Sequence, residues 1–344
     1  MPVLNTSAPD PSSNPASAAA APGVDVCGIG LNATDTIILL PRFPAHGEKI
    51  ELHAAEVLPG GQVASGMEAC ARWGLRARYV GAVGDDPAAE MQRARLAECG
   101  VEAHWFAAPG CLSQLAYILV DERSGERTIL WKRDARLEIQ PEQVQPEWVT
   151  TANAVLLDGH DTRASAVAAA WARAAGIPVV LDVDNIYDGL ADVLLNTDYI
   201  VGSADFPARL TGERDLRAAL RQIHTLFGCC FAGATLGKYG VVGWDGKELL
   251  HVPGFAVNAV DTTGAGDIFH GALVCALVHP ELKDLPLENK LEFSNAAASL
   301  NCTAPGARGG IRRLEETLNF MRTHAGERHR PDNLDEFLAN GGAA

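Results

Sequence analysis

The chain has 344 residues, of which 28 are Lys or Arg and 43 are Asp or Glu, so its formal net charge is −15. Hydrophobic residues make up 47% of it, which excludes a mostly disordered chain, because disordered chains have few apolar residues. The negative charge disfavours a nucleic-acid binder, since such a protein needs a basic face for the phosphates. We therefore expect no nucleic acid among its partners, and local groups would have to hold any anionic ligand.

Targeting signals and cysteine usage bear on the compartment. No apolar stretch reaches about 18 residues, so no membrane span is expected. Residues 1–23 are rich in Ala, Ser and Pro and lack the pattern of a signal peptide, which predicts a disordered tail. The eight cysteines form no CxxC pair and no zinc-type cluster, and most lie in apolar runs. This pattern predicts buried free thiols in a reducing cytoplasm.

Apolar runs and their flanking turn residues predict the elements of the first half. Strands are predicted over 24–32, 36–40, 49–53, 78–83, 115–120 and 128–132. Helices are predicted over 62–73 and 87–98. Ser124 and Gly125 predict a hairpin between the last two strands. The polar-alternating segments, about 36–53 and 112–132, predict a small separate sheet that forms a lid or a dimer surface.

From about residue 150 the pattern changes to short buried strands that alternate with helices. Strands are predicted over 154–157, 179–182, 199–201 and 230–236. Helices are predicted over 164–175, 190–195 and 216–226. Buried strands that alternate with helices indicate an α/β fold, in which a parallel sheet carries helices on both faces.

Two glycine motifs resemble nucleotide-binding signatures and are rejected. Residues 28–33 match GxGxxA after a strand, but a dinucleotide fold needs a helix there and residues 34–41 favour a strand. This disfavours a nicotinamide-dependent oxidoreductase. Residues 233–239 have three residues between the glycines and a Tyr after the Lys, so they are not a P-loop.

The strongest motif is a polar, glycine-rich turn, Asp-Thr-Thr-Gly-Ala-Gly-Asp at 261–267, which runs into the apolar segment 268–277. The unpaired N–H groups of a first helical turn, together with the helix dipole, form an anion site. Asp267 would lie at its mouth as a general base that takes a proton from an alcohol. The simpler alternative is that Asp261 or Asp267 only caps the helix.

Four motifs, in this order along the chain, resemble those of the PfkB, or ribokinase-like, sugar kinases. They are the glycine-pair segment 60–65 with the turn 80–86, the turn 235–240, the signature 261–272, and the helix residues 295–299 with the loop 305–307. The resemblance spans about 24–323. It implies a ribokinase-like three-layer α/β fold with a mostly parallel central sheet, helices on both faces and a small β lid.

The resemblance implies transfer of the ATP γ-phosphate to a hydroxyl, with Mg²⁺ on the phosphates. Asp267 matches the catalytic base, and Gly264, Ala265 and Gly266 match the backbone anion hole. The positions that match the substrate site are Asp35, Gly60, Gly61, Gln62, Ser65 and Arg127. Those that match the nucleotide site are Thr235, Gly237, Lys238, Gly240, Asn295 and Ser299.

A potassium site is also implied, at positions matching Asp261, Thr263, Asn301, Gly306 and Gly310. The chain departs from the family at two positions of this site. Many members have Lys or Asn at the position of Gln62, and many have Asn at the position of Ser65. These departures leave the identity of the substrate open. It also departs at 203–206, where many members have Asn-x-x-Glu. Asp205 is the nearest acid there and a candidate substitute in metal handling.

The expected organisation is a kinase domain over 24–325 that includes the lid, and a C-terminal tail over 326–344. Two copies are expected to pair through the lid strands. The expected acceptor is a ketose- or pentose-type sugar, because a nucleoside site would need aromatic stacking partners and aromatics are only 6% of the chain. The alternatives are a nucleoside kinase and a catalytically silent sugar- or nucleotide-binding regulatory module.

Overall fold

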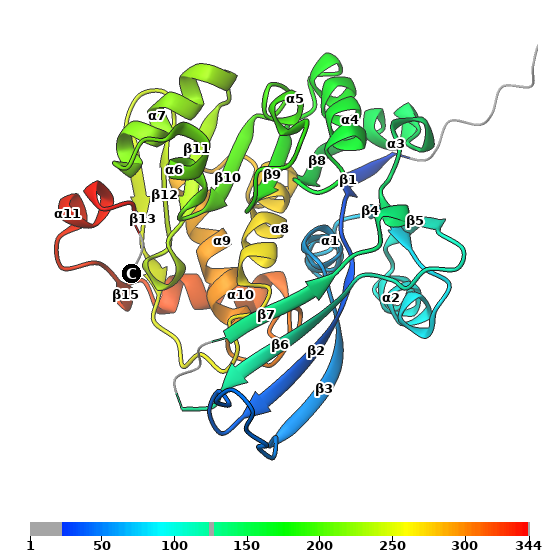
Figure 1. Ribbon diagram of the computed structural model, residues 1–344. Helices are drawn as coiled ribbons and strands as arrows, with labels where there is room; N and C mark the ends of the chain where they lie inside the picture. The colour runs from blue at the N-terminus through cyan, green and yellow to red at the C-terminus, as the bar shows by residue number, and fades with distance from the viewer. Residues whose placement is uncertain (1–22, 124–126, 343–344) are drawn as a thin grey trace, which may run out of the picture.

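The computed structural model describes residues 23–123 and 127–342. At its centre is a nine-stranded sheet in the order β13-β12-β11-β10-β9-β8-β1-β4-β5 (Figure 1). Neighbours from β11 to β5 are parallel, whereas β12 is antiparallel to both of its neighbours. The bounds are β1 Val24–Ile29, β4 Ala77–Val83, β5 Glu102–Ala107, β8 Ala152–Asp158, β9 Val179–Val183, β10 Tyr199–Ser203, β11 Phe231–Thr235, β12 Val241–Trp244 and β13 Leu249–Val252.

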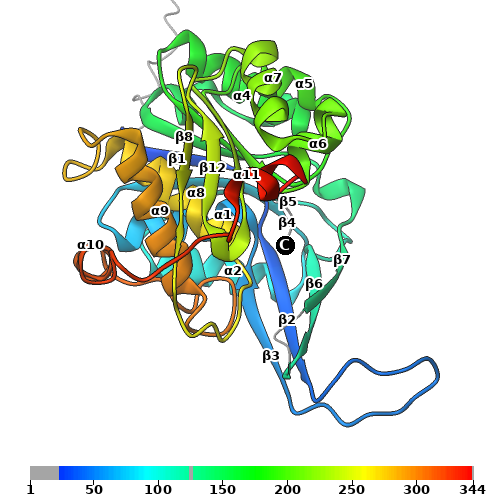
Figure 2. The same ribbon diagram turned by 90° about the vertical axis from the view of Figure 1, so that its left-hand side faces the viewer.

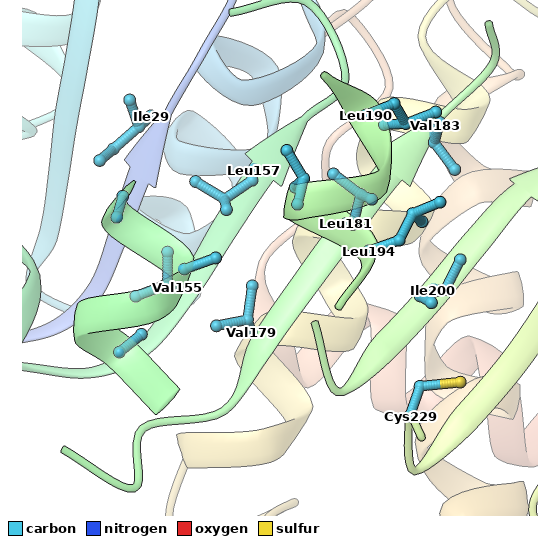
Figure 3. Close-up of a cluster of buried hydrophobic side chains, with 14 of the residues drawn as sticks. Ile29, Val155, Leu157, Val179, Leu181, Val183, Leu190, Leu194, Ile200 and Cys229 are labelled. Atoms are coloured by element: carbon cyan, nitrogen blue, oxygen red, sulfur yellow. The ribbon is translucent and has the colours of Figure 1, made fainter. Parts of the chain in front are cut away.

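Two apolar layers cover the two faces of this sheet, as the buried, near-continuous apolar strands predict. On one face, Leu157, Leu181 and their neighbours pack against α3 to α7 (Figure 3). On the other face, Leu156 and Val180 pack against α1, α8 and α9. The bounds are α1 Gln62–Arg72, α2 Pro87–Glu98, α3 Pro146–Thr150, α4 Thr162–Ala174, α5 Leu190–Leu194, α6 Phe206–Thr211, α7 Leu216–Phe227, α8 Ala265–Val278, α9 Leu287–Asn301 and α10 Leu314–Thr323.

The lid is a separate four-stranded sheet in the order β3-β2-β6-β7, which extends away from the helical layers (Figure 2). Its bounds are β2 Ala33–Leu40, β3 Ala54–Gly60, β6 Leu115–Asp121 and β7 Arg127–Lys132. Because β2 begins at Ala33, a strand rather than a helix follows Gly30, and the dinucleotide-binding motif is excluded. The hairpin turn predicted at Ser124 and Gly125 lies outside the described residues.

The structure corrects three sequence-based expectations. No strand forms over 49–53. In the antiparallel pair of β2 and β3, Leu39 is already opposite Ala54, and β2 ends one residue later, just before Pro41. Residues 49–53 therefore extend past the end of β2 and have no strand to pair with. The sequence does not predict the edge strand β5, because the polar residues Glu102 and His104 interrupt the apolar run that marks the other strands. The sequence also places the lid at about 36–53 and 112–132, whereas the lid strands span 33–60 and 115–132.

The C-terminal segment 326–344 is not a simple tail. Its described part forms β15, Arg328–His329, and α11, Leu334–Ala339. The strand β15 pairs with β14, Gly254–Phe255, and the ring of Phe337 lies 5.1 Å from that of Tyr239. The helix has an apolar side, and burial of Leu338 fixes it on the core. Among the described residues, no helix is long and apolar enough to cross a membrane.

Candidate active site

A cleft of about 1070 Å³ lies between the lid and the carboxyl edge of the central sheet. Most of the predicted site residues line it, although they come from segments far apart in the chain. They are Asp35, Gly61, Gln62, Arg127, Thr235, Gly237, Lys238, Gly240, Thr263, Gly264, Ala265, Gly266, Asp267, Asn295 and Ser299. Those that do not line it are Gly60, Ser65, Asp261, Asn301, Gly306 and Gly310.

The glycine-rich turn leads into α8 without a side-chain cap. The N-cap is Gly264, whose φ of 72° is in the left-handed region that favours glycine. A Cβ at Gly264 would lie 2.3 Å from the carbonyl oxygen of Ala307, so only glycine fits. The alternative that Asp261 or Asp267 only caps the helix is therefore wrong. The first turn of α8 faces the cleft, where its N–H groups and the helix dipole favour an anion.

Asp267 lies in this first turn, half-buried in the cleft. Burial raises the pKa of its carboxyl to about 7, and the carboxylates of Asp182 and Asp35 act in the same direction, while His270 and Arg308 oppose them. A carboxylate that titrates near neutral pH has the proton affinity that suits general-base catalysis.

Asp182, at the end of β9, lies beside two neighbours of Asp267. Burial raises the pKa of Asp182 well above the usual range, while the side chain of Gln62 beside it acts in the opposite direction. The Nδ1 of His270 lies 3.4 Å from the Asp182 carboxylate and 2.7 Å from the carbonyl oxygen of Gly266, and its Nε2 lies 3.0 Å from that of Val201. The start of α8 is thus tied to the ends of two central strands.

Asp35 lies on the lid strand β2, lines the cleft and is 5% exposed. Burial raises the pKa of its carboxyl to about 6. The glycine pair makes room for it, since a Cβ at Gly60 would lie 2.0 Å from the carboxylate. Gly61 has a φ of 97° and lies against the backbone of Asn32, so both glycines are required here.

Ser65 points away from the cleft, and its predicted place in a substrate site is not reproduced. It is fully buried, and its hydroxyl accepts a hydrogen bond from Nε of Arg308 at 3.0 Å. Gly60 also lies behind the cleft, where its carbonyl accepts from the same guanidinium. Periodicity places Ser65 on a helix but leaves open which partner the hydroxyl meets.

The opposite wall of the cleft holds the residues predicted for the nucleotide. Thr235 ends β11, and the short 3₁₀ turn Gly237–Tyr239 follows it. Gly240, with a φ of 84°, lies so close to β13 that a Cβ would be 2.1 Å from the carbonyl oxygen of Val252. Asn295, on α9, donates to the same oxygen at 2.8 Å. This wall is therefore fixed by contacts among its own residues.

The residues predicted for a monovalent cation cluster behind the glycine-rich turn. The carboxylate of Asp261 accepts from the backbone N–H groups of Thr263 and Gly306, both at 2.8 Å. Asn301 donates to the carbonyl oxygens of Thr263 and Ala307 and accepts from the N–H of Gly310. The hydroxyl of Thr263 is buried without a protein partner.

Sequence reasoning missed several residues that line the cleft, namely Gln114, Trp131, His160, Asp182, Asp184 and Tyr187. The amide oxygen of Gln114 and Nδ1 of His160 are buried without a hydrogen-bond partner. Asp182 could have been found, because a polar residue at the carboxyl end of a parallel strand faces the ligand crevice of an α/β fold. Asp205 does not line the cleft: it bonds to Ser203 and Arg209.

Known proteins resemble this chain over most of its length. The model of the "pfkB family carbohydrate kinase" matches residues 25–313. The ribokinase of Haemophilus influenzae is 29% identical over 85% of this chain and 97% of its own length. A fructokinase of Klebsiella pneumoniae is 28% identical over 72% and 87%.

Solved structures show the same fold. The crystal structure of ribokinase from Thermotoga maritima matches with a TM-score of 0.73 and 23% identity, over 87% of this chain and 99% of that one. The structure of Arabidopsis thaliana ribokinase complexed with ribose and ATP matches with a TM-score of 0.74 and 24% identity, over the same shares. The family match covers more than four fifths of the chain, and the chain therefore belongs to the pfkB family of carbohydrate kinases.

Proposed function

We propose that this protein transfers the γ-phosphoryl group of ATP to a hydroxyl of a small sugar of ketose or pentose type. Asp267 acts as the general base that takes the hydroxyl proton. The N–H groups of Gly264, Ala265 and Gly266 stabilise the charge that develops on the transferred group. Asp35 accepts hydrogen bonds from the sugar, and the wall around Thr235 and Asn295 receives the nucleotide.

One observation carries this proposal: a carboxylate with a pKa near 7 stands in the first turn of a helix whose N-terminus opens into the cleft. Phosphoryl transfer needs little covalent chemistry from the protein, so positioning and a local positive potential dominate. An overall charge of −15 repels a polyphosphate, and the turn and bound cations supply the attraction.

Mg²⁺ would enter with the nucleotide, since the described residues hold no cluster of three His, Cys, Asp or Glu side chains that could bind it alone. When bound it neutralises phosphate charge. We also propose K⁺ behind the turn, where the oxygens of Thr263, Asn301 and their neighbours gather. A rise in rate with KCl over choline chloride at equal ionic strength would support it, and equal rates would contradict it.

A nucleoside acceptor is the second candidate. The rings of Trp131 and Tyr187 line the cleft, so the aromatic partners that a base would need are available. An aminoimidazole riboside kinase of Salmonella typhimurium is 28% identical over 78% of this chain and 89% of its own length. The acceptor that gives the highest kcat/KM decides between the two candidates.

The test combines a substrate panel with one variant. Ketoses, pentoses and nucleosides are incubated with the protein, ATP and Mg²⁺, and ADP release is followed. Asp267→Asn is expected to abolish transfer while ATP still binds, and Asp284→Asn, an exposed acid outside the cleft, serves as the charge-matched control. Retained turnover in Asp267→Asn would refute the base assignment. No ADP release with any acceptor would favour the silent binding module.

We further propose that two copies pair through the outer face of the lid. Val57, Tyr117 and Leu130 are 46% to 53% exposed. The register places Thr36 opposite both Val57 and Tyr117, and Tyr117 opposite Leu130, so they form one row across all four strands. The alternate residues Ile129 and Trp131 face the cleft. The row is an apolar surface that a second copy of the same sheet could cover.

A further inference from the structure

A single buried arginine joins the two halves of the proposed site. Arg308 lies in the loop between α9 and α10, and its side chain is 3% exposed. Its Nε donates to the hydroxyl of Ser65 at 3.0 Å, and its Nη1 to the carboxylate of Glu68 at 3.2 Å. Its Nη2 donates to the carbonyl oxygen of Gly60 and, at 3.4 Å, to the amide oxygen of Gln92. The guanidinium is therefore fully engaged with the N-terminal part of the chain.

Glu68 has counterions besides Arg308. The buried carboxylate of Glu68 also pairs with Arg72 at 2.9 Å and with Arg95 at 2.5 Å. Three guanidinium groups thus surround one carboxylate, and the cluster keeps a net positive charge. A buried arginine beyond what the ion pair needs calls for another role, because burying a charge is costly unless its contacts compensate it.

The loop that carries Arg308 is fixed to the glycine-rich turn. The N–H of Gly306 donates to Asp261, and Gly264 packs directly on Ala307. The side chain of Asn301 adds bonds to both Thr263 and Ala307. Movement of residues 306–308 would therefore move the start of α8.

At its other end Arg308 holds the turn that lines the acceptor side. Gly60 precedes Gly61 and Gln62, which line the cleft, and it leaves the space that Asp35 occupies. Gln92, the fourth partner of Arg308, donates in turn to the carbonyl oxygen of Ala33 at the start of β2. Both segments that form the acceptor end are thus attached to one side chain.

We propose that Arg308 is a positioning residue that sets the distance between the acceptor turn 60–62 and the phosphoryl-transfer turn 261–267. The inference rests on the proposed function, because it assigns the acceptor to one turn and the phosphoryl group to the other. Phosphoryl transfer requires the reacting atoms about 3–3.5 Å apart, and a displacement of about 1 Å can lower the rate roughly a hundredfold. Arg308 touches neither reactant in this scheme. Besides its charge, which opposes the rise in the pKa of Asp267, it acts through the two turns.

The experiment compares Arg308→Met with Arg95→Met in the full chain. Both variants remove one guanidinium from Glu68, but within the described residues the ion pairs of Arg95 are with Glu68 and, at 3.6 Å, with Glu98. Arg308→Met is expected to lower kcat/KM for the best sugar by about tenfold to a hundredfold, with the KM for ATP within about twofold of the wild type. Arg95→Met is expected to keep kcat/KM for the sugar within about threefold. Equal losses in both variants, or a matching rise in the KM for ATP, would overturn the proposal.

Two further measurements keep the result interpretable. Hydrogen exchange of the amides at 60–65 is expected to be faster in Arg308→Met than in Arg95→Met, and unchanged protection would overturn the proposal whether or not a substrate is found. If the wild type phosphorylates no acceptor, the proposed function fails. The comparison of exchange rates still tests whether Arg308 holds the turn 60–62 in place. If Arg308→Met does not fold, Arg308→Lys takes its place. This variant is expected to lose less kcat/KM than Arg308→Met. A kcat/KM equal to that of the wild type would contradict the proposal.

Discussion

Replacing Asp267 by asparagine should make the protein more stable as well as inactive. Raising the pKa of one carboxyl from 3.8 to about 7 costs the folded protein roughly 4 kcal/mol once the group is ionised. Asp267 is only half-buried and the cleft admits water, so we expect about half of this, ~2 kcal/mol. Asparagine has nearly the same shape and removes the charge.

The sign of the pH dependence follows from proton linkage. The folded protein holds the Asp267 proton more tightly than the unfolded chain, so the cost is absent at low pH, begins near the unfolded pKa and is complete above pH of about 7. The gain from Asp267→Asn should therefore be ~2 kcal/mol at pH 8 and smaller, about 1.5 kcal/mol or less, at pH 5.

Urea unfolding at pH 5 and pH 8 measures this difference, with Asp284→Asn as the control for one lost negative charge. The control should change the free energy of unfolding by less than about 0.5 kcal/mol at either pH. If Asp267→Asn gains nothing at pH 8, or gains equally at both values, then burial does not raise the pKa of Asp267 and its assignment as a base of near-neutral pKa loses its support.

Three further predictions concern the turn, the pH profile and the lid. Gly264→Ala should lower kcat about a hundredfold and should destabilise the protein more than Gly212→Ala. Both glycines have a φ near 70°, but only a Cβ at Gly264 would collide with the backbone of Ala307. Equal melting temperatures of the two variants would contradict this clash. The rate kcat/KM should rise with pH through about 7 as Asp267 ionises, and a flat profile from pH 5 to 9 would exclude it as the titrating base. Leu130→Lys, on the outer face of the lid, should convert the dimer to monomers, as measured by light scattering. Trp131→Lys, on the face toward the cleft, should leave the dimer intact. An unchanged molar mass for Leu130→Lys would refute the dimer surface.

Local patterns in the sequence were enough for the framework of this protein. The strand and helix alternation after residue 150 predicts the parallel sheet, and the helix over 87–98 is reproduced as α2. The turn at 261–267 identifies Asp267 and its glycines, because small residues followed by an apolar helix are a contiguous signal. The resemblance to the PfkB kinases rests on similarly short segments, and the family match confirms it.

Tertiary structure decided how these segments meet. Ser65 faces Arg308 rather than the cleft, Gln62 lies beside Asp182, and the supposed tail packs as α11 on the core. The partners of Arg308 lie 216 to 248 residues away in the sequence. A periodic pattern reports only which face of an element is apolar, whereas the partner of a buried polar group depends on how distant elements pack. For this reason the glycine-rich turn that carries Asp267 was visible in the sequence, while the contacts that set the pKa of Asp267 and its place relative to the turn 60–62 were not.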